Sequence, residues 1–209
     1  MGAEALGVAL DEKAQQTLVL FLDELERWNA RLNLVGEHDR ESLADRHLVD
    51  SLAAAPIAAA LGADLRIADL GSGAGLPGVP LAVALASREM LLVEPRRKRA
   101  SFLRAIRRAL PDLGLSIEER RAEDLPPALA ASFDVIVSRA ALADDELAKA
   151  ARPLLRAGGL LIAYRGNAPQ PLGNDSADDG FGAALVHRYD LPSPRRSFSL
   201  VVRERSSFT

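Results

Sequence analysis

The segment from Asp69 to Gly78 is rich in glycine and has the spacing of a ligand-binding turn. Its first three glycines are Gly71, Gly73 and Gly75. Mostly apolar runs at 65–68 and 79–86 flank it, so the pattern predicts a buried strand entering the turn and a helix leaving it. Glycine lacks a Cβ atom, so a ligand can approach the backbone closely, and the helix start offers free N–H groups. We therefore expect this turn to bind a ligand.

Two classes of nucleotide ligand use such a turn, and residue 76 helps to separate them. A dinucleotide turn reads G-x-G-x-x-G, which would need glycine where this chain has Leu76. The observed spacing is G-x-G-x-G after Asp69, the form found in methyltransferases that bind S-adenosylmethionine with its methionine end over the turn. A tight strand-to-helix turn without a ligand is the alternative that the motif leaves open.

A carboxylate at the end of the next apolar run supports a nucleotide ligand. The run that begins at Met90 ends at Glu94, 25 residues after Asp69. This is near the spacing at which an acid reaches the ribose hydroxyls in nucleotide-binding α/β folds. We predict that Glu94 binds the ribose; the alternative is a solvated acid paired with nearby arginines.

Two further places could contribute to an active site. Leu43, His47 and Asp50 share one face of a predicted helix, so Asp50 could accept a proton from His47 and fix its tautomer, although such a pair can also be purely structural. Segments 121–124 and 138–140 follow two predicted strands, where backbone and carboxylate groups could read an adenine edge and Arg139 would place a permanent charge.

Arg139 stands where an amino-group methyltransferase usually carries an acid or amide with two prolines and an aromatic residue. Those residues are absent, so methylation of an exocyclic amine is disfavoured. A salt bridge from Arg139 to Glu123 or Asp124 is the alternative role for this arginine.

Basic residues gather on the helix predicted after Glu94. They are Arg96, Arg97, Lys98, Arg99, Arg104, Arg107 and Arg108. Such a helix can neutralise phosphates and bind nucleic acid in a salt-dependent way, whereas the alternative is a solvated helix face. The net charge of the whole chain is -3, so a nucleic-acid partner would have to meet a local patch.

Alternating helices and strands are predicted to position these residues. An amphipathic helix at 11–34 and a second helix from Asp39 into an alanine-rich stretch broken at Pro56 form an N-terminal cap over 1–62. The core over 63–209 contains predicted strands at 65–70, 90–94, 115–121, 133–138 and 159–165, and helices at 77–86, 96–110 and 144–156. Repeated βα units predict an α/β, Rossmann-like, doubly wound and mostly parallel sheet. An antiparallel hairpin of 183–190 and 197–203 follows a predicted mobile loop at 167–180.

The composition limits the number of domains and the kinds of site that this chain can form. With 209 residues and 48% apolar content, the chain fits a single domain. There is no cysteine, which excludes a disulfide, a thiolate metal site and a cysteine nucleophile; we expect no metal. We see neither a secretion signal nor a membrane span, so we expect a cytoplasmic protein, with a monomer favoured.

Five motifs together resemble the bacterial glucose-inhibited division protein B family. They are Trp28-Asn-x-x-x-Asn33-Leu, Arg46-His-x-x-Asp-Ser-Leu52, Asp69-x-Gly-Ser-Gly-Ala-Gly-x-Pro-Gly-x-Pro80-Leu, Glu94-x-x-x-Lys98-Arg-x-x-Phe-Leu103 and Val137-Ser-Arg-Ala140. The resemblance covers about residue 14 to Gly166, and it implies methylation of guanine N7 in 16S rRNA beside the decoding centre, with S-adenosylmethionine as the methyl donor. The chain departs from the family pattern at Val35, at Ala141 and after Gly166, where an acidic helix is usual.

The resemblance also implies roles for individual residues. Gly71, Leu76, Ala122, Glu123 and Arg139 would border the cofactor, and Asn33, His47 and Lys98 would lie on the RNA side. Guanine N7 has a lone pair and no proton, so alignment alone could drive the reaction without a general base. We expect Arg139 and His47 to orient the guanine, and Lys98 with Arg96, Arg97 and Arg99 to bind RNA.

Three other functions stay open. A small molecule or protein could be the methylated substrate, and if that substrate needed deprotonation only His47 qualifies as a base. A non-catalytic RNA-binding or cofactor-sensing module would bind the cofactor without turnover. A nicotinamide oxidoreductase is weakened by Leu76.

Overall fold

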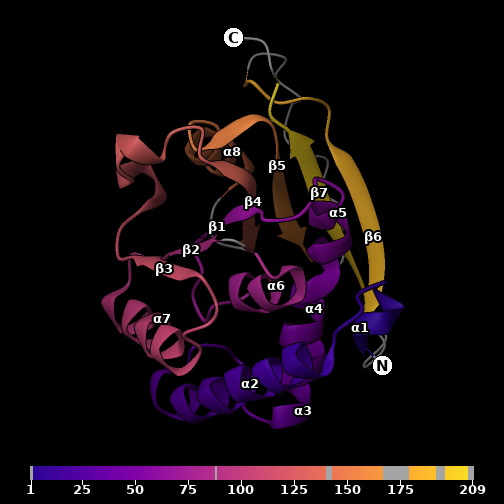
Figure 1. The fold of residues 1–209 in the computed structure, drawn as a ribbon, viewed down its shortest axis with the longest axis vertical. Coiled ribbons are helices and arrows are strands. Elements are labelled where there is room, and N and C mark those ends of the chain that lie inside the picture. Colours follow the sequence, from indigo (N-terminus) through magenta and orange to yellow (C-terminus); the bar gives the residue numbers. More distant parts are fainter. Residues whose placement is uncertain (1, 88, 140–142, 167–178, 192–195, 207–209) are drawn as a thin grey trace.

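The computed structural model describes residues 2–87, 89–139, 143–166, 179–191 and 196–206, and it confirms the predicted fold class (Figure 1). A seven-stranded sheet has the order β3-β2-β1-β4-β5-β7-β6. The strands are β1 (Arg66–Leu70), β2 (Glu89–Val93), β3 (Leu115–Glu118), β4 (Phe133–Arg139), β5 (Leu155–Arg165), β6 (Leu185–Leu191) and β7 (Arg196–Glu204). β1 to β5 pair in parallel, whereas β7 pairs antiparallel with both β5 and β6.

Helices pack on both faces of the sheet. On one face α6 (Gly78–Leu85) and α7 (Arg97–Ala109) join the N-terminal helices in the larger apolar core. On the other face α8 (Asp144–Ala151) covers a smaller core. Figure 1 shows α6 on the near side of the sheet, with α2 below α6, and α8 on the other side. This arrangement is the doubly wound architecture that the alternating pattern predicts.

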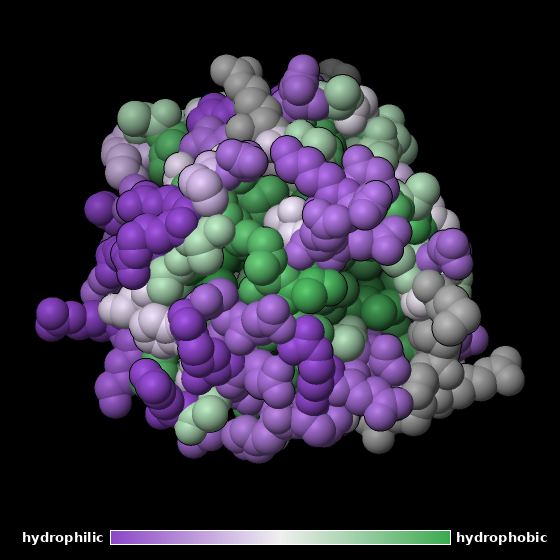
Figure 2. Space-filling view, turned by 60° about the horizontal axis from the view of Figure 1, so that its bottom comes forward, coloured by the Kyte–Doolittle hydropathy of each residue, from purple (hydrophilic) through white to green (hydrophobic). Residues whose placement is uncertain are grey.

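The parallel pairing places three predicted site segments on one edge. Asp69 lies opposite Leu92 of β2 and Val137 of β4. The glycine turn after β1, Glu94 after β2 and Arg139 at the end of β4 therefore emerge together at the carboxyl edge, where open α/β sheets bind ligands. Figure 2 brings the lower part of the molecule forward and shows a hollow with apolar surface between hydrophilic residues.

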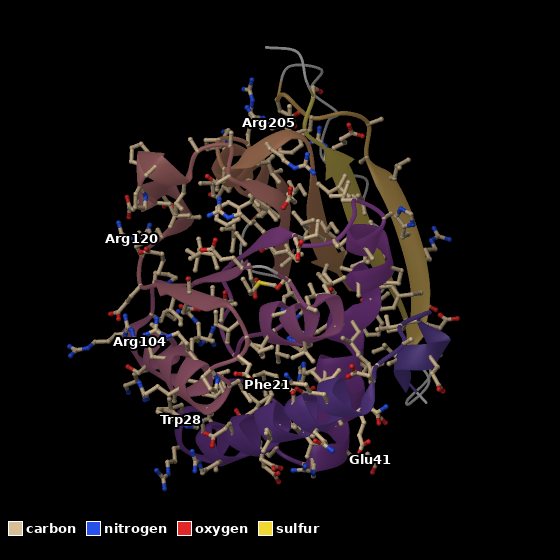
Figure 3. The ribbon with its side chains drawn as sticks, viewed as in Figure 1. Phe21, Trp28, Glu41, Arg104, Arg120 and Arg205 are labelled. Carbon is tan, nitrogen blue, oxygen red and sulfur yellow. The ribbon has the colours of Figure 1, made fainter. Side chains whose placement is uncertain are left out.

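The first long helix packs onto this framework through one apolar stripe. α2 (Glu12–Leu32) begins at Asp11, whose side chain accepts a hydrogen bond from the Ala14 N–H at 2.7 Å. Phe21, which Figure 3 labels, is fully buried, and its ring is 3.6 Å from where a Cβ on Gly75 would lie. The ring of Trp28 lies 5.7 Å from that of Phe102 in α7. α2 therefore packs against the glycine turn through Phe21.

The second predicted helix is divided into short pieces. They are α3 (Arg40–Ser42), a π-helical turn (Leu43–Leu48), α4 (Val49–Ser51), a 3₁₀ turn (Leu52–Ala54) and α5 (Ala55–Ala59). A separate short helix, α1 (Gly2–Ala5), precedes α2. The alanine-rich stretch is interrupted beside Pro56, as predicted: a 3₁₀ turn comes before it, and Pro56 lies in the first turn of α5, where its missing N–H costs little. The π-helical turn changes which side chains share a face, with consequences for the site.

Three boundaries differ from the predictions by three residues or more. β3 ends at Glu118 instead of 121, and a 3₁₀ turn forms at Ala122–Asp124; a second lies at Pro127–Leu129. α8 ends at Ala151 instead of 156 because Pro153 cannot donate a helical hydrogen bond. β5 begins at Leu155 instead of 159 since its first residues pair with β4 across a register shift. Residues 167–178 of the predicted loop and Ala140–Ala141 lie outside the described residues.

The far edge of the sheet is open on the side of β6. Leu185 and Val186 of this strand are 62% and 46% exposed. Among the described strands β6 pairs only with β7, which follows it in the chain but lies between it and β5.

The division of the chain into a helical cap at 1–62 and a core at 63–209 stays a prediction.

Candidate active site

The glycine turn has a backbone that other residues adopt with difficulty. The φ angles of Gly71, Gly73 and Gly75 are 80°, 55° and 74°, all in the left-handed region. The N–H groups of Gly71 and Ser72 donate to the Val93 carbonyl at 2.9 and 3.0 Å, which ties the turn to β2. A Cβ on Gly75 would lie 2.9 Å from a methyl carbon of the neighbouring Val79, so packing as well as conformation requires glycine there.

Glu94 closes this turn from the adjacent strand. Its carboxylate is 3% exposed; one oxygen accepts a hydrogen bond from the Gly73 N–H at 3.0 Å and the other from the Arg96 N–H at 2.8 Å. The alternative of a solvated acid paired with arginines does not describe this side chain. Each carboxylate oxygen can accept a further hydrogen bond, so Glu94 retains the capacity to bind ribose hydroxyls.

Asp69 has a buried oxygen without a partner. Its side chain is fully buried, Oδ2 accepts a hydrogen bond from the Gly78 N–H at 2.9 Å, and Oδ1 has no hydrogen-bond partner among the described residues. Burial raises the pKa of Asp69 from 3.8 to about 7, although the Gly78 N–H and the Arg139 charge act in the opposite direction. A buried acceptor left unpaired is costly, so this position suits a ligand that brings a cationic donor.

The pH dependence of stability offers a test of this environment. A raised folded-state pKa means that Asp69 favours folding while protonated and that this contribution is lost as pH rises through about 7. We therefore expect Asp69→Asn to gain stability over the wild type between pH 4 and 8, on the order of a few kcal/mol. Urea unfolding at several pH values measures the difference. Asp112→Asn, which changes an exposed acid, serves as the control, and a difference between D69N and wild type that stays constant with pH would contradict the assignment.

The expected pairing of His47 with Asp50 is wrong. Nε2 of His47 lies 2.5 Å from a carboxylate oxygen of Glu37, whose other oxygen lies 2.5 Å from Nη1 of Arg46. The π-helical turn through His47 shifts its direction away from Asp50. Burial, followed by the charge of Arg139, lowers the pKa of His47, although Glu37 and Asp50 oppose this. At neutral pH the imidazole is therefore neutral and donates Nε2–H to Glu37.

Arg139 also has a different partner from the one expected. Nη1 of Arg139 lies 3.1 Å from Oδ2 of Asp50, and neither Glu123 nor Asp124 pairs with it. Glu123 instead lies 3.8 Å from Arg121 and is exposed in the 3₁₀ turn after β3, beside the half-buried Ala122. The arginine at the end of β4 is thus joined to the N-terminal helices.

Two residues of the N-terminal motif shape the loop that carries Glu37. The amide of Asn29 is 1% exposed; it donates to the Glu37 carbonyl at 2.6 Å and accepts from the Val35 N–H at 2.9 Å. Asn33 ends α2 with φ of 48°, a conformation that asparagine tolerates better than most residues. Sequence reasoning missed the structural role of Asn29, although the motif that contains it was recognised. The place of exposed Asn33 on an RNA side stays a prediction.

The basic residues of α7 (Arg97–Ala109) and of the segments around it, from Arg96 to Arg120, fall into two groups. Arg104 and Arg120, labelled in Figure 3, pair with Glu119 and Glu118 at 2.7 Å. In the part of the chain that the structure describes, no ion pair involves Arg96, Arg97, Lys98, Arg107 or Arg108. The first turn of α7 contains no acidic residue, and cations there oppose the helix dipole. The charges at the start of α7 therefore do not stabilise the helix, whereas Arg107 and Arg108 in its last turn favour the dipole.

Arg99 differs from its neighbours. It is half-buried, and its Nη1 lies 3.4 Å from where a Cβ on Gly73 would be. Its side chain therefore lies against the glycine turn, whereas Arg96, Arg97 and Lys98 are exposed.

In the described ranges no group of three His, Asp or Glu side chains could hold a metal ion, and no helix is long and apolar enough to cross a membrane.

Comparison with known proteins agrees with the site. A family model described as rRNA small subunit methyltransferase G matches residues 14–174. The ribosomal RNA small subunit methyltransferase G of Geobacter sp. (strain M21) is 35% identical over 209 residues, covering 98% of this chain and 95% of that protein.

Solved structures share the fold at low identity. Precorrin-6y C5,15-methyltransferase from Geobacter metallireducens GS-15 has a TM-score of 0.54 at 14% identity and covers 73% of this chain and 86% of its own. A mutant of MtNAS in complex with S-adenosylmethionine has a TM-score of 0.59 at 18% identity, with 90% and 72% covered. These structures share the fold, while the family model and the Geobacter relative confirm the resemblance that the motifs indicate: the chain belongs to the rRNA small subunit methyltransferase G family.

Proposed function

We propose that the chain is an S-adenosylmethionine-dependent methyltransferase that modifies N7 of a guanine in 16S rRNA near the decoding centre. The observation that carries the proposal is one edge of the sheet where an open glycine turn, the unpaired oxygen of Asp69 and the guanidinium of Arg139 meet. Membership of the methyltransferase family supports the donor and the rRNA substrate. The N7 position and the decoding centre come from the motif resemblance and are part of the proposal.

The residues at this edge fit S-adenosylmethionine. Oδ1 of Asp69 would accept a hydrogen bond from the methionine ammonium, which removes the cost of its missing partner. Glu94 would bind the ribose hydroxyls, and Gly71 and Gly73 leave the backbone open to the ligand. The other residues that border the cofactor would be Leu76, Ala122 and Glu123. When bound, the cofactor supplies an electrophilic methyl group.

Besides binding the cofactor, the protein would have to orient the guanine for attack on the methyl group. The N7 lone pair needs no deprotonation, so a neutral His47 engaged with Glu37 and a permanently charged Arg139 suffice. Guanine presents O6 beside N7 as two acceptors, and a donation from Arg139 to O6 would leave N7 free to attack. Alignment of nitrogen, methyl and sulfur lowers the barrier by several kcal/mol (about 7 in good cases).

The free cations at the start of α7 would bind the RNA backbone. Arg96, Arg97 and Lys98 are exposed, have no ion pair among the described residues and follow β2 at the same edge as the glycine turn. The net charge of -3 excludes attraction by the molecule as a whole, so this local patch has to provide it. The N7 edge is inaccessible inside an A-form groove, so the target base would be unpaired or turned out of its helix.

The salt dependence of RNA binding tests the role of this patch. Replacing Arg96, Arg97 and Lys98 together with alanine is expected to reduce the slope of log affinity against log salt by about two, since three phosphate contacts are lost. Arg104→Ala/Arg120→Ala, which removes cations already paired with glutamates, is the control and should leave the slope nearly unchanged. Filter binding to a 16S rRNA fragment at several salt concentrations gives both slopes; equal slopes would contradict the assignment.

The activity itself can be tested directly. Small ribosomal subunits that lack the modification are incubated with the protein and a labelled methyl donor, and the product is mapped by chemical cleavage at N7-methylguanine. The proposal predicts label in 16S rRNA at one guanine. Label in protein or in a small molecule would favour the rival methyltransferases, and cofactor binding without turnover would favour a binding module.

A further inference from the structure

Asp50 connects two strands that are not neighbours in the sheet. This residue is 6% exposed and lies in the short helix α4. Its Oδ2 accepts a hydrogen bond from Nη1 of Arg139 in β4 at 3.1 Å, and its Oδ1 accepts one from the hydroxyl of Tyr189 in β6 at 2.5 Å. Since β5 and β7 lie between β4 and β6, the contact joins the cap, the reaction edge and the closing hairpin.

Arg139 has a second carboxylate within its electrostatic reach. Asp69 of β1 pairs with Val137 of β4, two residues before Arg139, so the side chains of Asp69 and Arg139 project from the same face of the sheet. The charge of Arg139 also acts to lower the pKa values of Asp69 and His47. Asp69 has an oxygen without a partner and would attract the arginine if Asp50 did not hold it. An Arg139–Asp69 pair would occupy the oxygen that the proposed function assigns to the cofactor ammonium.

Tyr189 fixes the orientation of the Asp50 carboxylate. Burial, followed by the charge of Asp50, raises the pKa of this tyrosine well above its ordinary value, so the hydroxyl remains protonated and donates. The tyrosine ring stacks on Phe198 of β7 with centroids 5.9 Å apart, which holds the donor in place. With one oxygen engaged by Tyr189, the other is directed at Arg139.

We propose that Asp50, oriented by Tyr189, is a positioning residue that holds the Arg139 guanidinium toward the substrate and away from Asp69. This inference rests on the proposed function for its effect on turnover. Its effect on cofactor affinity does not depend on the RNA substrate.

The chain offers a matched control for Tyr189. Tyr164 of β5 is 4% exposed; its hydroxyl donates to the Ser51 carbonyl at 2.5 Å and accepts from the Ala54 N–H at 3.3 Å. Both tyrosines therefore tie the same helical segment to the sheet through one hydroxyl. Only Tyr189 donates to the Asp50 carboxylate.

The first arm of the test compares these tyrosines in turnover on unmodified small subunits. Tyr189→Phe is expected to lower kcat about 5- to 20-fold with little change in KM, whereas Tyr164→Phe should lower stability in urea and change kcat less than about twofold. Equal losses of kcat in the two variants would mean that any loosening of the helix has the same effect, and the inference would be overturned.

The second arm uses binding of S-adenosylhomocysteine measured by calorimetry. Asp50→Asn is expected to weaken binding about tenfold because Arg139 moves to Asp69, and adding Arg139→Ala should return the affinity to within about twofold of Arg139→Ala alone. A general structural defect would not be rescued in this way, so absence of rescue would overturn the inference. If the wild type fails to methylate small subunits, the proposed function fails, while this arm still decides the role of Asp50.

Discussion

Gly75→Ala is expected to reduce affinity for S-adenosylhomocysteine at least about 100-fold, which corresponds to about 2.7 kcal/mol. The new Cβ would lie 2.9 Å from Val79 and 3.3 Å from Leu103, and the residue has φ of 74°. The strained backbone costs about 1–2 kcal/mol and the overpacking about 1–3 kcal/mol, so the turn must move. Because this turn leads the backbone past the proposed cofactor position, its displacement is expected to lower ligand affinity before it unfolds the protein.

A second glycine separates strain from packing. Gly7 has the same φ of 74°, but nothing lies within 4 Å of the Cβ that it lacks. Gly7→Ala should therefore lose about 1–2 kcal/mol of stability and keep its affinity for S-adenosylhomocysteine. Calorimetry gives the affinities and urea unfolding gives the stabilities. Wild-type affinity in folded G75A would show that the ligand does not use this turn.

The joint replacement of His47 and Arg139 with alanine is expected to lower kcat/KM for the small subunit at least about 100-fold, which is a modest loss for groups that orient a reacting base. Affinity for S-adenosylhomocysteine should change less than about tenfold, since Glu94 and the glycine turn remain. Single-turnover methyl transfer followed by mapping of N7-methylguanine measures the effect. Full methyl transfer by the double variant would refute the orienting role.

Arg66→Ala is a suitable control for this experiment. Arg66 is a half-buried arginine paired with Glu89 at 2.8 Å, at the opposite end of β1 from the glycine turn. Its loss should lower stability without lowering kcat/KM. A similar loss of activity in both variants would mean that removing any half-buried arginine impairs the enzyme, and the assignment of Arg139 would be wrong.

The sequence was sufficient where the relevant interactions are local. The spacing of glycines after an apolar run predicts the turn, and the acid after the next run predicts that Glu94 meets it, because parallel neighbouring strands end at one edge. The order of alternating elements predicts the doubly wound sheet with its antiparallel closing hairpin. For the turn the signal lies in one short stretch of chain, and for the sheet it lies in the order of successive elements.

The pairing of side chains could not be predicted in the same way. An ideal helix through 43–51 places His47 beside Asp50, but a π-helical turn changes the angle between them and Glu37 takes the histidine. Tyr189 reaches Asp50 only because β7 inserts between β5 and β6, which no local pattern shows. Arg139 was expected near Glu123 because both follow strands, whereas the closer carboxylate comes from the N-terminal helices.

The insertion of β7 between β5 and β6 has a consequence for synthesis of the protein. A nascent chain that ends at Arg165 already contains the glycine turn, Glu94 and Arg139, but β6 has no neighbour until β7 has left the ribosomal exit tunnel. The hydrogen bond from Tyr189 to Asp50 cannot form before β6 has been synthesised. Unfinished chains would therefore contain the glycine turn before Tyr189 is present to orient Asp50 and Arg139.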